Sequence, residues 1–490
     1  NDGMLHAFDA DTCREVFAYI PSMLIHKIKY LSSLPYEHLY YVDGQINVGK
    51  VKIDGADRNL LVGGLGAGGR GLYALDITTP VIDPITNNET EQQLADRSAK
   101  LIRWEITPSA INYVASTSYA DLGYTYGTPV IAEADTGSVV IVGNGYRNEG
   151  SGRAVLYIID PKTGNLLKAI DACASGADCG TTAEPNGLST PTAIDTNKDG
   201  KVDRVYAGDL NGNLWKFDIS SVSSGSVSLL FQAGQAITGA PAVAMHPEGG
   251  YIVVFGTGQM LVSDIDENDP SIHSVYGIWD GAPSSNTTLL EQTLVEKSYA
   301  NGSVTARVRV ASTHQPNWSS GGHRGWRTKL PAGERAIADL GFIENGRYYF
   351  TATNPTVSSG ENWLLELDYL TGGGRNKPFL DLNGDSKVNA QDTVTVSDGE
   401  IANKITGVPI GKWMNTGLLS HPVLARMAKT DTTLFNSNPN MDFETSDSPT
   451  DSGGPGISDG HFDFDIYYGG SSFRKQKHVH EYDDKYDVTG

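Results

Sequence analysis

The sequence is poor in cysteine, in basic residues and in long apolar runs. Its 490 residues include 3 cysteines and only 37 lysines and arginines against 58 aspartates and glutamates, so the formal net charge is −21. This acidity argues against nucleic acid as the main partner, because phosphate binding needs a basic surface. No apolar run reaches the roughly 18 residues of a membrane-spanning helix, so the sequence does not predict an integral membrane protein.

The spacing of the cysteines indicates the compartment. Cys173 and Cys179 lie in the short polar segment DACASGADCG, and two cysteines that close so small a loop suggest a disulfide and an oxidising environment. No histidine or third cysteine lies near them, which argues against a metal site. Cys13 would then be unpaired, or its partner would lie outside this chain.

The first residues, NDGMLHAFDAD, do not begin with methionine and contain no charged segment followed by an apolar one. They are therefore not a signal peptide, and their pattern is typical of the middle of a strand. We expect this chain to be a C-terminal portion of a longer exported protein.

Short phrases recur along the chain. An apolar or aromatic pair followed by alternating residues ends in aspartate at seven places: Asp9, Asp76, Asp160, Asp218, Asp280, Asp368 and Asp483. An aliphatic run and a glycine-rich turn often precede this phrase, as in LLVGGLGAGG (60–69) and YIVVFGTGQ (251–259). Several units open with proline and aliphatic residues, as in GTPVIA (127–132), and proline suits the first residue of a strand.

Each unit thus indicates a four-stranded antiparallel blade, and the seven phrases predict an all-β, seven-bladed propeller. We expect residues 1–490 to form this single domain. Their number exceeds what seven typical blades of roughly 40–50 residues need. The wide spacings place long insertions near 81–125, 281–330 and 370–420. The Ser, Asp, Asn and Gly content of 430–460 predicts a flexible loop.

The segment DTNKDGKVD (195–203) has the spacing of a calcium loop. Four oxygen-bearing side chains and one backbone carbonyl fall at positions 1, 3, 5, 9 and 7 of an EF-hand-like pattern: Asp195, Asn197, Asp199, Asp203 and the carbonyl of Lys201. Gly200 stands at position 6, where the sharp turn needs glycine. Position 12 is Tyr206, so the usual bidentate carboxylate is missing. The loop would replace a hairpin turn between two blade strands.

A second segment, DLNGDSKVNAQD (381–392), repeats the pattern and resembles the loop of dockerin modules. The expected ligands at positions 1, 3, 5, 7, 9 and 12 are Asp381, Asn383, Asp385, the carbonyl of Lys387, Asn389 and Asp392. Ser386 replaces glycine at position 6. Asp/Asn-rich turns also form without metal, but so many oxygens at the right offsets favour Ca²⁺ in both loops.

The remaining chemistry-bearing motifs do not indicate catalysis. GGLGAGGRG (63–71) contains Gly-x-Gly-x-x-Gly, but LYALDI follows it, whereas the dinucleotide fingerprint needs a helix there. No Gly-x-Ser-x-Gly nucleophile motif is present, and no acid–base pair is evident. The sequence therefore predicts a protein that is not an enzyme and has no catalytic residues.

The aspartate-turn phrases resemble the repeats of quinoprotein-like propellers, and the whole chain is similar to the C-terminal domain of the PilC/PilY family of type IV pilus tip-associated biogenesis factors and adhesins. The segments that carry this resemblance are NDGMLHAFDA (1–10), GGLGAGGRGLYALDIT (63–78), DTNKDGKVDRVYAGDLNGNLWKFD (195–218), GWRTKLPAGER (325–335) and KHVHEYDDKYDVTG (477–490). The resemblance implies a modified seven-bladed propeller with calcium in the loop 195–203. The prediction of calcium in the loop 381–392 is based on its spacing alone and not on the resemblance.

The resemblance also implies a function. It predicts export through the periplasm and outer membrane to the cell surface and the pilus tip, a role in pilus assembly and twitching motility, and calcium occupancy that opposes retraction. The expected partners are minor pilins and the pilus machinery, with a host-cell or abiotic surface as a further target of adhesion.

Two other functions are compatible with a propeller. One is a periplasmic scaffold for outer-membrane assembly, which would lack the calcium loops and long insertions. The other is a quinone-dependent dehydrogenase, which would be expected to have an adjacent cysteine pair and eight blades. A binding protein stabilised by calcium fits the residues better than either.

Overall fold

The computed structural model describes residues 2–34, 38–79, 90–261, 266, 268–337, 341–356, 361–385 and 387–414, and the strand backbones of 423–428, 443–444 and 462–467. Most regular structure in these residues is β-strand, as the sequence predicts. The helices are short: α1 (Ile25–Ile28), α2 (Glu91–Leu101), α4 (Asp398–Ala402) and 3₁₀ turns at Ser22–Leu24, Lys29–Ser32, Gly66–Gly68, Val222–Ser224 and Ala390–Asp392. The chain divides into two compact units, Asn1–Pro241 and Ala242–Gly490, which are described separately.

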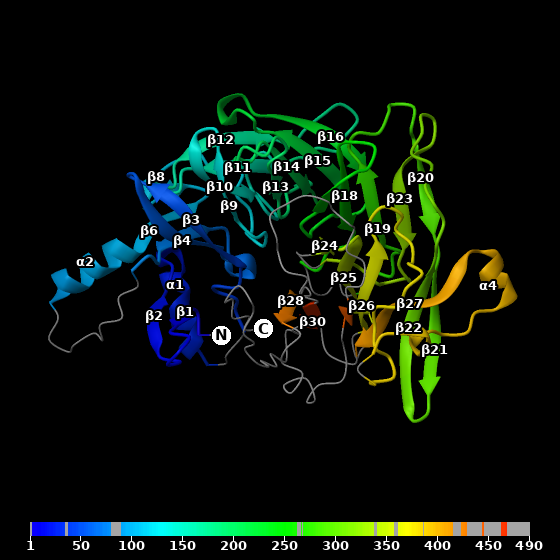
Figure 1. Ribbon diagram of the computed structural model, residues 1–490. Helices are drawn as coiled ribbons and strands as arrows, with labels where there is room; N and C mark the ends of the chain where they lie inside the picture. The colour runs from blue at the N-terminus through cyan, green and yellow to red at the C-terminus, as the bar shows by residue number, and fades with distance from the viewer. Residues whose placement is uncertain are drawn as a thin grey trace. The chain divides into compact units, whose positions relative to one another are not determined.

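Unit 1 contains, in its described part, one hairpin and three antiparallel sheets (Figure 1). The hairpin pairs β1 (Leu5–Phe8) with β2 (Glu15–Tyr19). The first sheet has the order β3 (Ile46–Ile53), β4 (Ala56–Gly64), β5 (Leu72–Asp76), β6 (Ile102–Thr107), β7 (Ala110–Ile111), β8 (Val114–Ala115). The second has the order β12 (Leu166–Asp171), β11 (Val155–Ile159), β10 (Gly137–Gly143), β9 (Val130–Ala134). The third has the order β13 (Thr192–Ile194), β14 (Arg204–Gly208), β15 (Asn213–Asp218), β16 (Ser226–Gln232). The second and third sheets are the four-stranded meanders that the repeats predict.

Unit 2 contains larger sheets. One has the order β17 (Ala242–Met245), β18 (Tyr251–Gly256), β19 (Ser274–Trp279), β23 (His323–Lys329), β20 (Thr288–Gln292), and β20 runs parallel to β23. The next has the order β21 (Leu294–Asn301), β22 (Val304–Ser312), β27 (Ile405–Met414), β26 (Glu361–Asp368), β25 (Arg347–Asn354), β24 (Phe342–Glu344). The third has the order β28 (Val423–Ala428), β30 (Phe462–Tyr467), β29 (Phe443–Glu444).

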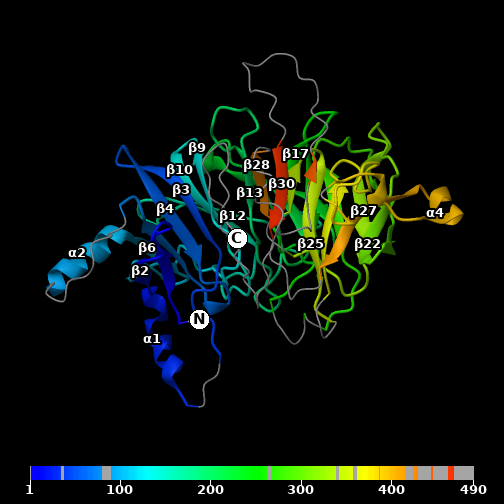
Figure 2. The same cartoon turned by 60° about the horizontal axis from the view of Figure 1, so that its bottom comes forward.

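The predicted insertions carry regular structure. The range 81–125 includes α2 and β6 to β8, the range 281–330 includes β20 to β23, and the range 370–420 includes α4 and β27. Within their own units, α2 and α4 project away from the neighbouring sheets in both views (Figures 1 and 2). Apart from residues 443–444, the predicted flexible loop at 430–460 lies outside the described residues. The assignment of the whole chain to one domain stays a prediction.

The apolar core of unit 1 lies between successive sheets. Leu60 and Val62 of the first sheet share a buried cluster with Tyr157 of the second. The next residue of β11, Ile158, faces the other way and joins Trp215 of the third sheet. Because successive side chains of a strand point to opposite faces, a strand covered on both faces is apolar throughout. This explains the uninterrupted apolar sequence VLYII of β11.

Tryptophans fasten one sheet to the turn of the next. Trp104 of β6 lies on Gly164, in the turn between β11 and β12, and its indole N–H donates to the carbonyl of Pro161 at 3.0 Å. A Cβ at Gly164 would come within 2.8 Å of the Trp104 ring. In unit 2, Trp326 of β23 lies in the same way on Gly372, in the turn after β26, where a Cβ would come within 2.1 Å. Both glycines end an aspartate-turn phrase, so this phrase supplies a docking place for a tryptophan.

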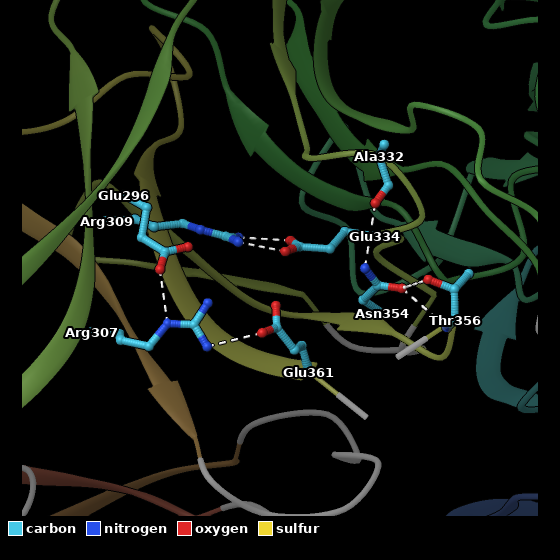
Figure 3. Close-up of polar contacts among 8 residues, drawn as sticks. All are labelled: Glu296, Arg307, Arg309, Ala332, Glu334, Asn354, Thr356 and Glu361. Carbon is cyan, nitrogen blue, oxygen red and sulfur yellow. Dashed lines mark hydrogen bonds and ion pairs between the residues drawn. The ribbon is translucent and has the colours of Figure 1, made fainter. Parts of the chain in front are cut away.

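Unit 2 also buries an ion pair (Figure 3). Arg309 of β22 donates to both carboxylate oxygens of Glu334 through its two terminal guanidinium nitrogens, Nη1 at 2.7 Å and Nη2, and each side chain is only 2% exposed. The Arg309 guanidinium carbon lies 3.7 Å from the centre of the Trp363 ring, which adds a cation–π contact. Glu334 belongs to the segment GWRTKLPAGER, so this part of the resemblance coincides with a packed polar contact.

The predicted disulfide between Cys173 and Cys179 is present. The side chains of Asn213 and Gln232 each donate a hydrogen bond of 3.0 Å to backbone carbonyls inside its loop. The loop is thereby held against the third sheet of unit 1. Cys13 is free and exposed.

Candidate calcium loops

Residues 195–203 connect β13 to β14 as a tight curl around the Asp195 carboxylate. Its Oδ1 accepts from the backbone N–H of Lys198 at 2.6 Å, and its Oδ2 accepts from that of Gly200 at 2.7 Å. Lys198 and Gly200 both have a positive φ, of 64° and 85°. Desolvation raises the pKa of Asp195, but the backbone N–H groups together hold this pKa below its ordinary value.

The other predicted ligands lie along the same curl. The Asn197 Oδ1 accepts from the backbone N–H of Asp199 at 2.9 Å, and Asp199 Oδ1 accepts from that of Lys201 at 2.9 Å. Asp203 accepts from the backbone N–H and the hydroxyl of Thr196, the hydroxyl at 2.8 Å. Residues 197–201 are exposed. The curl is therefore shaped by its own backbone and opens to solvent.

This first loop is tied to two sheets of unit 1. Asp203 donates its backbone N–H to Ile194 at 3.0 Å and accepts at its carbonyl from Ile219 at 2.9 Å, both within the third sheet. The backbone N–H of Val202 donates to the carbonyl of Glu133 in β9 at 2.7 Å. A change in the loop would therefore act on the second sheet as well as the third.

The loop 381–392 is closed by two buried carboxylates. Asp381 is 3% exposed and accepts from the backbone N–H of Gly384 at 2.7 Å. Asp392 is fully buried and accepts from those of Leu382 at 2.8 Å and Asn389 at 2.9 Å. Leu382 belongs to a small apolar cluster beneath the loop. This loop is thus built on packed side chains, unlike the first.

The middle of the second loop repeats the local bonds of the first. Asn383 Oδ1 accepts from the backbone N–H of Asp385, and Asp385 Oδ1 accepts from that of Lys387, each at 2.9 Å. Asn389 caps the short 3₁₀ turn Ala390–Asp392. Ser386 lies outside the described residues.

The donor set of the first loop fits a hard cation. Three carboxylates, one amide oxygen and one backbone carbonyl are all oxygen donors, as Ca²⁺ prefers, and water can complete its six to eight ligands. The described part of the chain holds no group of three or more His, Cys, Asp and Glu side chains arranged around a metal position. A calcium ion would therefore depend on Asn197, on the Lys201 carbonyl and on rotation of the carboxylates.

Within each unit, successive sheets share a buried apolar cluster and a tryptophan of one sheet lies on a glycine turn of the next, which is the arrangement of blades in a β-propeller. The sequence comparisons agree with this class. Residues 1–229 and 220–298 match the family model of the PilY1 beta-propeller domain. The chain belongs to this family, which confirms the resemblance; the number of blades stays a prediction.

Relatives and a solved structure support the assignment. A type IV pilus biogenesis factor PilY1 homolog of Xylella fastidiosa is 36% identical over 408 residues, which are 76% of this chain and 26% of the relative. The type IV pilus biogenesis factor PilY1 of Pseudomonas aeruginosa is 33% identical over 459 residues, 82% of this chain and 37% of the relative. The chain thus spans about a quarter to a little over a third of these relatives. The crystal structure of the Pseudomonas aeruginosa PilY1 C-terminal domain superimposes with a TM-score of 0.68 and 30% identity over 87% of both chains.

Two further observations concern surfaces. Among the described residues, no helix has the length and apolar character needed to cross a membrane. The sequence analysis also missed a cluster in unit 1, which we call the tyrosine–arginine surface: Tyr40, Arg70, Tyr124, Tyr126, Tyr146 and Arg147. The phrases YTYG (124–127) and GYRNEG (145–150) are the signal that could have indicated it.

Proposed function

We propose that this chain is the calcium-binding, non-enzymatic propeller of a type IV pilus biogenesis factor, which supports pilus assembly and surface attachment by binding partners. The observation that carries the proposal is the loop 195–203, whose oxygen donors lie on one curl within a propeller of the PilY1 family. The names of the relatives, all pilus biogenesis factors, support a binding role.

The loop would act through electrostatics. A bound Ca²⁺ supplies positive charge that offsets the repulsion among three carboxylates. Asp195 and Asp199 fix the shape of the loop by accepting backbone hydrogen bonds. Because Val202 donates a backbone hydrogen bond to β9, a shift of the loop would also move the second sheet. At a hundredfold excess of free calcium over Kd, binding stabilises the folded form by about 2.7 kcal/mol, which is enough to order a docking surface.

The second loop is proposed as a further calcium site, with Asp381, Asn383, Asp385, Lys387, Asn389 and Asp392 as its ligands. Its two outer carboxylates are buried and held by backbone N–H groups, so little of the chain has to be ordered on binding. Two sites would together place up to four positive charges on a chain whose net charge is −21.

The cellular part of the proposal follows the family. The protein would be exported through the periplasm to the outer membrane and the pilus tip, with minor pilins and the pilus machinery as partners and with calcium occupancy opposing retraction. The disulfide fits an oxidising compartment.

Calorimetry tests the metal sites. The wild-type chain is expected to bind two calcium ions, Asp199→Ala one fewer, and Asp385→Ala one fewer. Asp57→Ala, an exposed carboxylate outside both loops, serves as the control and should leave the count unchanged. An unchanged count in Asp199→Ala would show that the first loop is not a calcium site.

Pilus display tests the function. In a strain that carries Asp195→Ala and Asp199→Ala in the full-length protein, surface pili and twitching should change, whereas Asp57→Ala should behave as wild type. Unchanged piliation and unchanged twitching would contradict the calcium switch.

A further inference from the structure

The tyrosine–arginine surface is one connected cluster. The rings of Tyr124 and Tyr146 lie 6.5 Å apart, the Arg70 guanidinium lies 5.3 Å from the Tyr124 ring and that of Arg147 lies 5.2 Å from the Tyr146 ring. Desolvation, together with Asp43 and the neighbouring tyrosines, raises the pKa of Tyr126 to about 12. The three tyrosines at 124, 126 and 146 are half-buried, so their rings are held in place and still reach solvent.

Arg147 occupies a strained position at the edge of this cluster. Its φ of 51° is left-handed, a conformation that costs free energy for any residue with a Cβ. The residues on either side of Arg147 are both held in place. The preceding residue, Tyr146, exchanges two backbone hydrogen bonds with Tyr124, of 2.6 and 3.0 Å. Asn148 is 3% exposed and bonds to Gly152 N–H and to the Asn186 carbonyl. Strain that the surrounding structure maintains often marks a functional residue.

The charge of Arg147 is not compensated within the described residues. Glu149, the carboxylate of the same turn, is committed to Arg70 at 2.6 Å. Arg147 is exposed, and its contact is with the Tyr146 ring rather than with a carboxylate. A guanidinium stacked on a ring keeps its planar fork of donors oriented for a carboxylate from outside.

We propose that the tyrosine–arginine surface docks an acidic segment of a protein partner, with Arg147 binding its carboxylate and the tyrosine rings packing against its neighbouring residues. Tyrosine and arginine are the residue types enriched in the energetically important centres of protein interfaces. Nucleic acid or an anionic membrane would require a broad surplus of positive charge, whereas Arg70 is already paired with Glu149 and only Arg147 offers an uncompensated charge on this surface. The identification of the partner as a pilus subunit rests on the proposed function. The preference of the surface for an acidic segment does not depend on that function.

Selection from a displayed library of random ten-residue peptides tests the surface. Peptides enriched on the wild-type chain should contain Asp or Glu, and each is then synthesised with its acids and with the matching amides. Binding measured by biolayer interferometry should weaken at least tenfold in Arg147→Ala, and equally when the acids become amides. Arg153→Ala is the control, because Arg153 is an exposed arginine close in sequence whose guanidinium pairs with Asp171, and it should bind as wild type.

The glycine variant separates binding from folding. Arg147→Gly removes the guanidinium and relieves the left-handed strain, so its melting temperature should equal or exceed that of wild type while peptide binding is lost. Selection of no peptide, an absence of acidic residues among those selected, or wild-type affinity in Arg147→Ala overturns the proposal. The proposal is also overturned if the wild-type chain binds a glycan array instead of the peptides and Arg147→Ala abolishes that glycan binding.

Purified ectodomains of the pilin-like subunits distinguish this inference from the proposed function. Binding that Arg147→Ala weakens supports both. Binding that is insensitive to Arg147→Ala overturns the role of the surface and leaves the pilus function standing. Acidic peptides that bind through Arg147 while no pilin ectodomain binds would support the surface and contradict the pilus partner.

Discussion

The buried ion pair of unit 2 gives the sharpest test of how the fold is held together. We predict that Glu334→Gln destabilises the chain strongly, although it keeps the size and shape of the side chain. The change leaves the Arg309 guanidinium 2% exposed on the Trp363 ring with no carboxylate opposite it. A charge that remains buried without its partner is the costly outcome, rather than the loss of the attraction itself.

The expected magnitude follows from this burial. Breaking a buried pair by removing one partner costs about 3–5 kcal/mol, or roughly two to four orders of magnitude in the ratio of folded to unfolded molecules. Replacing both partners with apolar residues, as in Arg309→Met with Glu334→Leu, removes the uncompensated charge. The double variant should therefore be more stable than Glu334→Gln, and the two substitutions should be strongly non-additive.

Urea unfolding followed by tryptophan fluorescence measures this, because Trp363 lies against Arg309 and reports on unit 2. Calcium is held constant, since any bound ion shifts apparent stability. Glu296→Gln is the matched control: Glu296 of β21 pairs at 2.8 Å with Arg307, which lies two residues before Arg309 on β22 (Figure 3), but the two side chains are 43% and 35% exposed. It should cost no more than about 1 kcal/mol. Equal effects of the two glutamine variants would refute the reasoning.

Three further predictions concern packing and pH. Gly164→Val should cost about 1–3 kcal/mol more than Gly137→Val in urea unfolding, because both glycines have a positive φ but only at Gly164 would a Cβ meet the Trp104 ring. Reducing the disulfide should lower the thermal midpoint by the equivalent of about 2 kcal/mol, the loop-closure entropy of so short a loop. Burial lowers the pKa of His246 to about 4, so this residue stabilises the fold fully above its unfolded value near 6.5, and the contribution is lost as the pH falls toward 4. Wild type should lose about 2–3 kcal/mol more than His246→Phe between pH 7 and pH 4.5 in urea titrations.

The blade pattern was predictable from the sequence because it is local. Strand, turn and strand follow one another along the chain, and β9 to β12 and β13 to β16 are meanders whose neighbours in space are neighbours in sequence. In unit 2 the order changes: β23 inserts between β19 and β20, and β20 pairs with it in parallel. No short-range signal specifies this, because a parallel pair is set by a connection that leaves the sheet and returns.

The curled backbone of the two candidate calcium loops was predictable for the same reason, whereas calcium binding stays a prediction. The expected donors are separated by one residue each, or by two between Asn389 and Asp392, so a single curl brings them together. The spacing does not show that Asp381 and Asp392 are buried whereas residues 197–201 are exposed. That difference comes from the apolar cluster beneath the second loop, which includes Tyr299 of a strand more than eighty residues earlier.

The tyrosine–arginine surface could not be predicted from local spacing, because its ion pair joins residues that are far apart in the sequence. In the phrase GYRNEG, Glu149 stands two residues after Arg147, and proximity in sequence would pair them. The fold pairs Glu149 instead with Arg70, which follows the glycine-rich turn of the first sheet, and Arg147 is left on a tyrosine ring. An uncompensated cation in this acidic chain therefore arises from the packing of the first sheet against the second. The net charge of −21 gives no indication of it. A recognition surface of this kind becomes visible only when each charge has been assigned its partner in space.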